Sequence, residues 1–270
     1  MTLKTLQLSD PYGTVSYVEA GRGEPLVLIH GVGMQSAAWK PQVRELSKTH
    51  HVFALDMPGH GGSDPLANDS TLEDYVQWLR AVLQGLGLPR VNLAGHSMGA
   101  LIAGGFAVSH PEMVARVALL NGVYRRDPEK RAAVEARAEA IRQGDYDTAT
   151  PLNRWFGDGR ADEAARAQVE GWLRAVDPAG YATAYSAFAK GDSTFADGFA
   201  SIRCPLLALT GEHDPNSTPA MSRAMADAAP QGRAVVVKGH RHMVNLTAAE
   251  AVNTELRRWL DTEVDVEETS

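Results

Sequence analysis

The segment VNLAGHSMGALIAGGFAVS, residues 91–109, carries the signal that decides the fold of this chain. Its first four residues form an apolar run typical of a buried strand, and residues 98–109 are typical of a buried helix. Between them stands the G-x-S-x-G pattern Gly95-His96-Ser97-Met98-Gly99. Glycines two residues on either side of a serine remove side chains that would clash on a sharp strand-to-helix turn, and the helix start favours developing negative charge. The segment therefore predicts a nucleophile elbow with Ser97 at its tip.

Outward from this segment, short apolar runs alternate with stretches of helical periodicity. Strands buried on both faces and separated by helices of about 10 to 15 residues predict a parallel sheet with crossover helices. Helices are expected near residues 36–47, 71–86, 98–109, 218–229 and 246–260. Strands are expected at Leu3–Leu8, Thr14–Glu19, Pro25–Ile29, His51–Leu55, Val91–Ala94, Val114–Leu120, Pro205–Leu209 and Ala234–Val237.

The alternation stops between about residues 124 and 200. There the composition turns to Ala, Glu and Arg with helical spacing, in residues 127–143, 162–176 and 178–189. Most of the aromatic side chains of the chain also fall in this part, and ligand sites favour domain interfaces with aromatic walls. We therefore predict a catalytic core of residues 1–123 and 201–262, a helical cap of residues 124–200, and an acidic tail of residues 263–270.

Together these segments resemble the α/β-hydrolase superfamily, and the resemblance covers nearly the whole chain. It implies an α/β fold with a mostly parallel eight-stranded sheet, helices on both faces and a helical cap insertion. It also implies a catalytic triad in the chain order Ser, then Asp or Glu, then His. The motifs that carry the resemblance are His30-Gly31-Val32-Gly33, residues 56–63 (DMPGHGGS), the elbow, Gly211-Glu212-His213-Asp214-Pro215, and a histidine-containing loop before the last helix.

The acid of such a triad should follow a strand downstream of Ser97. Asp214 does so, in a loop with Gly and Pro after the strand at residues 205–209. Asp56 also ends a strand, but it precedes the serine and begins a glycine-rich turn, which favours a structural role. Asn121 stands where some relatives place the acid, and an amide cannot act as one. The sequence therefore predicts Asp214 as the acid.

The base should be a histidine, because a serine hydroxyl needs an adjacent base to become a nucleophile. Only His240 and His242 lie downstream of Asp214. The run from His242 to Leu246 resembles the family's run after its catalytic histidine, so His242 is the predicted base and His240 the alternative. His96 is expected to pack in the elbow.

The oxyanion of the reaction needs backbone N–H donors that are already in place. The N–H of Met98 is one expected donor, and the second comes from the loop after the third strand, either Val32 or Gly33, with Val32 preferred. Ser63 is a weak rival to Ser97, because it is a serine beside a glycine turn and nothing more.

The ordered set Ser97, Asp214 and His242 predicts a serine hydrolase that cleaves a carboxylic ester or a lactone through an acyl-enzyme. Three alternatives stay open: a carbon–carbon bond hydrolase of ring-cleavage products, a perhydrolase, and a non-catalytic small-ligand binder on the same fold. The carbon–carbon hydrolases commonly resemble Gly-Asn-Ser at the elbow, whereas this chain has Gly95-His96-Ser97. No cofactor and no metal is expected, since the chain lacks a P-loop, a dinucleotide fingerprint and a cluster of metal ligands around His240 and His242.

Charge and composition narrow the partners. The net charge is −7, of which five charges belong to the acidic residues of 261–270, so the body is nearly neutral and nucleic acid is not an expected partner. No run is long enough to span a bilayer, the start does not have the pattern of a secretory signal, and Cys204 is the single cysteine. These features predict a cytoplasmic protein with a small, mainly apolar substrate. Any preference for an acidic substrate must then come from individual cap arginines.

Overall fold

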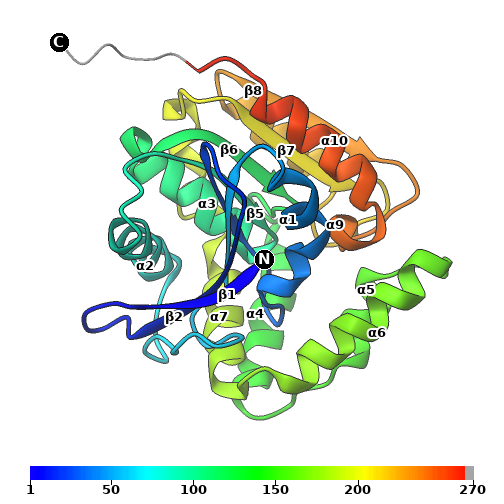
Figure 1. The fold of residues 1–270 in the computed structure, drawn as a ribbon. Coiled ribbons are helices and arrows are strands. Elements are labelled where there is room, and N and C mark those ends of the chain that lie inside the picture. The colour runs from blue at the N-terminus through cyan, green and yellow to red at the C-terminus, as the bar shows by residue number, and fades with distance from the viewer. Residues whose placement is uncertain (265–270) are drawn as a thin grey trace.

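Eight strands form one sheet in the order β1-β2-β4-β3-β5-β6-β7-β8 in the computed structural model, which describes residues 1–264 (Figure 1). β1 pairs antiparallel with β2 and β2 antiparallel with β4, whereas all later pairs are parallel. This confirms the predicted fold class. The strands are β1 (Thr2–Gln7), β2 (Thr14–Ala20), β3 (Pro25–Ile29), β4 (His51–Leu55), β5 (Val91–His96), β6 (Val114–Leu120), β7 (Leu206–Gly211) and β8 (Gly232–Val237).

Alternate residues of the central strands point to opposite faces, and each face is buried under helices. Along β3, Leu26 and Leu28 pack with α1 (Lys40–Leu46), α9 (Val244–Thr247) and α10 (Ala249–Leu260). The alternate residues of the same strand, Val27 and Ile29, pack on the other face with α2 (Leu72–Gly85), α3 (Met98–Ser109) and α8 (Pro219–Ala228). Burial on both faces explains why these strands are continuous apolar runs in the sequence.

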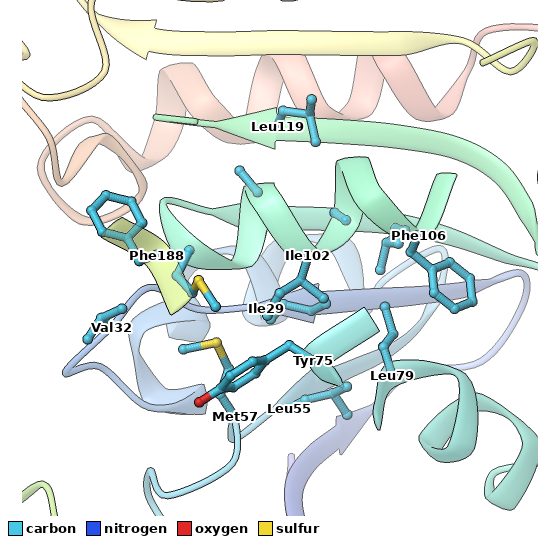
Figure 2. Close-up of a cluster of buried hydrophobic side chains, with 14 of the residues drawn as sticks. Ile29, Val32, Leu55, Met57, Tyr75, Leu79, Ile102, Phe106, Leu119 and Phe188 are labelled. Atoms are coloured by element: carbon cyan, nitrogen blue, oxygen red, sulfur yellow. The ribbon is translucent and has the colours of Figure 1, made fainter. Parts of the chain in front are cut away.

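The core beside the elbow lies between the sheet and helices α2 and α3, and side chains from all three pack together there. Figure 2 shows Ile29 and Leu119 of the sheet packed against Ile102 and Phe106 of α3, all of them fully buried or nearly so. Burying a side chain of this size stabilises the fold by about 1.5–3 kcal/mol. The cluster holds β5 and α3 rigidly on either side of Ser97.

Four helices between β6 and β7 form the insertion that the sequence predicts: α4 (Pro128–Arg142), α5 (Ala149–Trp155), α6 (Arg160–Ala175) and α7 (Pro178–Lys190). α4 and α7 pack on each other, and α5 and α6 run out at the lower right of Figure 1. The sequence did not indicate α5, because a segment of seven residues that contains a proline is too short to show helical periodicity. The predicted domain boundaries stay a prediction, and the predicted acidic tail lies outside the described residues from residue 265 on.

Two predicted helices are each divided. The stretch at residues 36–47 forms a 3₁₀ turn, Ser36–Trp39, followed by α1, with Pro41 in the first turn of α1, where its missing N–H costs nothing. The stretch at residues 246–260 forms α9 and α10. No helix within residues 1–264 has both the length and the apolar character that crossing a membrane requires.

Candidate active site

Ser97 occupies the sharp turn between β5 and α3, with φ 55° and ψ −114°. A non-glycine residue held in such a conformation costs about 1–3 kcal/mol, which the packed strand and helix on either side must offset. The flanking glycines are obligatory: a Cβ on Gly95 would lie 1.9 Å from the carbonyl oxygen of Gly99, and a Cβ on Gly99 would lie 2.2 Å from that of Ile29. The Ser97 N–H donates to the carbonyl of Leu120 at 2.9 Å and ties the turn to β6.

The side chains of His242 and Asp214 form a buried pair at the carboxyl ends of β8 and β7. Nδ1 of His242 lies 2.7 Å from Oδ2 of Asp214. Because a carboxylate can only accept, Nδ1 carries the ring hydrogen and donates a hydrogen bond to Asp214. Both residues are 2% exposed. The pairing leaves Nε2 of His242 as the proton acceptor of the ring. His242 and Ser97 line one cavity.

Asp214 is held as a carboxylate by further donors. Its Oδ1 accepts from the backbone N–H groups of Asn216 at 2.8 Å and Ser217 at 3.1 Å, and its Oδ2 accepts from Nδ2 of Asn121 at 2.8 Å. Burial acts to raise the pKa of Asp214, but His242 and these donors outweigh burial and bring the pKa below its ordinary value. Asn121, which the sequence excluded as an acid, therefore supports the Asp214 carboxylate from the end of β6.

The two rival histidines make other contacts. Nε2 of His96 donates to the backbone carbonyl of His242 at 2.9 Å, and burial lowers the pKa of His96 to about 3, so its ring is neutral. His240 hydrogen-bonds Oγ1 of Thr247 through its Nδ1 at 3.0 Å and does not line the cavity. The structure thus brings His242, rather than His240 or His96, to Asp214. The contact from His96 to His242 was not visible in the sequence.

The loop after β3 distinguishes the two expected oxyanion donors. The N–H of Gly33 donates to Nε2 of His60 at 2.9 Å and is therefore occupied. The N–H groups of Val32 and Met98 have no hydrogen-bond partner within residues 1–264. Val32 also lines the cavity with Ser97. Val32 and Met98 are consequently the pair of free donors near the serine.

Asp56 and Ser63 organise the turn that follows β4. Oδ1 of Asp56 accepts from the N–H of Ser36 at 2.6 Å, and Oγ of Ser63 donates to the carbonyl of Asp56 at 2.8 Å and accepts from the N–H of Ser16 at 2.9 Å. Neither side chain lines the cavity. Their positions agree with the structural roles that the sequence favoured.

A cavity of about 400 Å³ lies over Ser97 and His242, and most of its wall comes from the cap. Aromatic rings form one part of the wall, as predicted: Trp155, Tyr181, Tyr185 and Phe188. Figure 2 shows Val32 and Phe188, which both line the cavity, at the left end of the core cluster. The lining also contains four cationic side chains and no carboxylate: Arg126, Lys130, Arg137 and Arg154. This cationic wall does not favour the mainly apolar substrate that the sequence predicted.

Among residues 1–264, no group of three or more His, Cys, Asp or Glu side chains is arranged to hold a metal ion. His213, which a metal-based alternative would need beside Asp214, has an exposed side chain whose Nε2 lies 3.6 Å from Oε2 of Glu212.

Comparison with known proteins gives four further findings. The family model of the alpha/beta hydrolase fold matches residues 24–249. An (E)-2-((N-methylformamido)methylene)succinate hydrolase of Acinetobacter baylyi is 53% identical over 262 residues, which are 97% of this chain and 99% of that protein. The solved structure of an enol-lactonase from Burkholderia xenovorans is similar, with a TM-score of 0.81 and 27% identity over 93% of this chain and 100% of that one. A malate-bound esterase from Thermogutta terrifontis has a TM-score of 0.84 and 25% identity over 96% of this chain and 98% of that one.

Proposed function

Because the chain belongs to the alpha/beta hydrolase fold family, we propose that it is a serine hydrolase that removes the formyl group from a small N-formyl enamide bearing two carboxylates. The observation that carries the proposal is the buried pair of His242 and Asp214, 2.7 Å apart, beside a cavity that Ser97 also lines. A histidine held in one tautomer next to a serine on a strained turn is the arrangement that nucleophilic acyl transfer requires.

The bond type comes from the Acinetobacter relative. Its name describes a formamide whose nitrogen is attached to an alkene with a succinate skeleton, and it contains no ester and no lactone. Ester or lactone cleavage is supported only through the shared fold, by the esterase and the enol-lactonase structures. The relative therefore supports the alternative kept open above, a carbon–carbon bond hydrolase, more than ester or lactone cleavage. Its name describes a formamide, however, and from this we propose cleavage of the acyl C–N bond, which was not among the alternatives.

In the proposed mechanism, Oγ of Ser97 attacks the formyl carbon while Nε2 of His242 accepts its proton. Negative charge develops on the carbonyl oxygen, where the free N–H groups of Val32 and Met98 stabilise it. Asp214 stabilises the imidazolium, which forms only after the proton transfer.

The C–N bond then breaks, and His242 returns its proton to the leaving enamine. Water, deprotonated by His242, attacks the formyl ester on Ser97. This second step releases formate and restores the serine. Each loss of an oxyanion donor should cost about 100- to 1000-fold in rate.

The test is formate release from (E)-2-((N-methylformamido)methylene)succinate by the purified protein, run beside p-nitrophenyl acetate and an enol lactone. We expect the enamide to be the best substrate by kcat/KM and Ser97→Ala to lose at least about 1000-fold. Ser201→Ala, an exposed serine far along the chain, is the matched control. A preference for the lactone or the ester would overturn the bond assignment. Undiminished turnover by Ser97→Ala would overturn the nucleophile.

A fluorophosphonate probe separates catalysis from simple ligand binding. Mass spectrometry should find the label on Ser97, whereas a non-catalytic binder would leave this serine unmodified. A cytoplasmic place of action stays a prediction of the sequence.

A further inference from the structure

Arg126 is a buried guanidinium in the wall of the catalytic cavity. It is 7% exposed, and its Nη2 has no hydrogen-bond partner in the described part of the chain. A buried donor without a partner costs about 1–3 kcal/mol, and more when it is charged. A ligand that brings an acceptor to Nη2 would satisfy this donor.

The rest of the Arg126 side chain is fixed in place. Nη1 donates to the carbonyls of Phe188 and Ala189 at 3.3 Å each, and the guanidinium carbon lies 4.5 Å from the centroid of the Phe188 ring. These contacts set the plane of the guanidinium before a ligand arrives, so binding need not order it.

The charge of Arg126 is not cancelled by its neighbours. Its nearest carboxylate is Asp192, 3.4 Å from Nη1, but Asp192 also accepts from Nη2 of Arg131 at 3.2 Å. Two guanidinium groups therefore share one carboxylate, and this trio keeps one net positive charge. Burial lowers the pKa of Arg126, which reflects how little water reaches it.

Arg154 is the second uncompensated cation of the wall. Within residues 1–264 its guanidinium forms no salt bridge, and the one hydrogen bond of its side chain is long, 3.5 Å from Nη1 to Oδ1 of Asn216. The other two lining cations have their own partners: Lys130 pairs with Asp127 at 2.8 Å, and Arg137 pairs with Asp145 at 3.2 Å and Asp147 at 2.8 Å.

We propose that Arg126 and Arg154 form a dicarboxylate-binding subsite in the cap, which selects dianionic acids for the nucleophile below. This subsite rests on the proposed function, and it names the residues that would bind the two carboxylates of the proposed substrate. One carboxylate pairs with Arg126 and supplies the missing partner of Nη2, and the second pairs with Arg154. The cavity of about 400 Å³ has room for a short diacid over Ser97.

The test compares binding and turnover. Calorimetry with succinate and butyrate measures the contribution of the second carboxylate without any chemistry at Ser97. Arg126→Met and Arg154→Gln should each weaken succinate binding, and raise KM for the dianionic enamide, by about 10- to 100-fold. In both variants the ratio of kcat/KM for the dianionic enamide to kcat/KM for the neutral p-nitrophenyl acetate should fall by about 10- to 100-fold, because the ester has no carboxylate for an arginine to bind.

Two further arginines complete the comparison. Arg131→Gln leaves Asp192 to Arg126 alone, so it should weaken the preference for succinate over butyrate, but by less than Arg126→Met, because Arg131 does not line the cavity. Arg174→Gln, on the exposed surface of α6 and paired with Glu170, should change neither substrate.

The outcomes are distinguishable. Equal losses for the dianion and the neutral ester in Arg126→Met and Arg154→Gln, or an effect of Arg131→Gln as large as theirs, would show a structural role and overturn the subsite. Equal binding of succinate and butyrate to the unaltered protein would also overturn it. Selective succinate binding without Ser97-dependent formate release would instead contradict the proposed function and leave the subsite standing. Should Arg126→Met fail to fold, the exposed Arg154 carries the same comparison.

Discussion

The backbone N–H of His242 donates a hydrogen bond to the carbonyl oxygen of Trp155, with 3.2 Å between nitrogen and oxygen. The indole of Trp155 also stacks on the imidazole, at 5.7 Å between centroids and 27° between planes. Trp155 is the last residue of α5 in the cap, whereas His242 follows β8 of the core. The position of α5 and the orientation of the proposed base are therefore coupled.

Arg241 fixes that coupling from the core side. Its Nη1 donates to the carbonyls of Asn153 at 3.1 Å and Phe156 at 2.9 Å, on either side of Trp155. We expect Arg241→Gln to lower kcat by about 10-fold, because charge-assisted hydrogen bonds of this kind contribute about 1.5–3 kcal/mol. Steady-state kinetics would measure the change in kcat. The control is Arg233→Gln, because Arg233 lies on β8 and pairs with Glu255. Equal kinetics in the two variants would contradict the coupling.

Asp214→Asn tests the acid. The neutral amide no longer stabilises the imidazolium, and its NH2 group can donate to Nδ1 and hold the ring in the wrong tautomer. We therefore expect kcat to fall by about 10,000-fold while the protein stays folded. The rate of formate release and of ester hydrolysis should fall together. Asp227→Asn, an exposed aspartate on α8, is the matched control. A loss below about 10-fold for Asp214→Asn would assign the acid elsewhere.

Gly33→Ala tests the contact between the loop after β3 and the cap. Gly33 has φ +78°, and a Cβ there would lie 2.5 Å from Cδ2 of Leu173 and 2.9 Å from Cε2 of Tyr181. Gly87 has φ +68° and nothing within 4 Å of such a Cβ, so Gly87→Ala measures the backbone strain alone. We expect Gly87→Ala to cost about 1–2 kcal/mol and Gly33→Ala about 1–3 kcal/mol more, in urea unfolding. Equal losses of unfolding free energy in the two variants would mean that the Leu173 and Tyr181 side chains move aside at Gly33 without loss of stability.

The pH dependence of stability should reflect His96. Burial lowers its pKa from the ordinary 6.5 to about 3, so below pH 6.5 the unfolded chain binds a proton that the folded chain does not. Stability therefore falls as the pH falls, by about 1.4 kcal/mol per pH unit for this one residue. His30 and His60 are also buried with lowered pKa values and add to the same trend.

Unfolding free energies measured at pH values of about 7.5 and 5 would isolate the contribution. His96→Gln keeps a donor for the carbonyl of His242 but cannot titrate. Its loss of stability over this range should be smaller than that of the unaltered protein by roughly 2 kcal/mol. If the unfolding free energies of the two proteins changed with pH in parallel, a neutral, buried His96 would not be the cause of the loss of stability at low pH.

Much of the fold could be predicted because its signals are local. Apolar runs and helical spacing are properties of neighbouring residues, and α3 begins and ends where the sequence predicts, at Met98 and Ser109. The short α5 was missed, since its seven residues make only about two helical turns, too few to show a periodic pattern. Its formation depends on packing against α6 and on the contacts of Arg241 and His242 at its end.

The candidate site divides in the same way. The order of Ser97, Asp214 and His242 along the chain, read with the strands before them, was enough to nominate the three residues. The sequence favoured the N–H of Val32 as the second donor and kept that of Gly33 as the alternative. That choice depends on His60, 27 residues away, whose Nε2 occupies the Gly33 donor.

By itself the sequence determined the sheet, the elbow and the three residues of the candidate site, because strand periodicity and turn chemistry act over a few residues. Only the tertiary structure decided what surrounds the serine. Arg126 precedes α4 and Arg154 lies in α5, and the packing of the cap over the sheet brings both to one cavity. There, within the described residues, Nη2 of Arg126 has no hydrogen-bond partner and Arg154 has no carboxylate partner. The net charge of the chain cannot show this, because it counts the charged residues and does not say which of them lie close together in the folded protein.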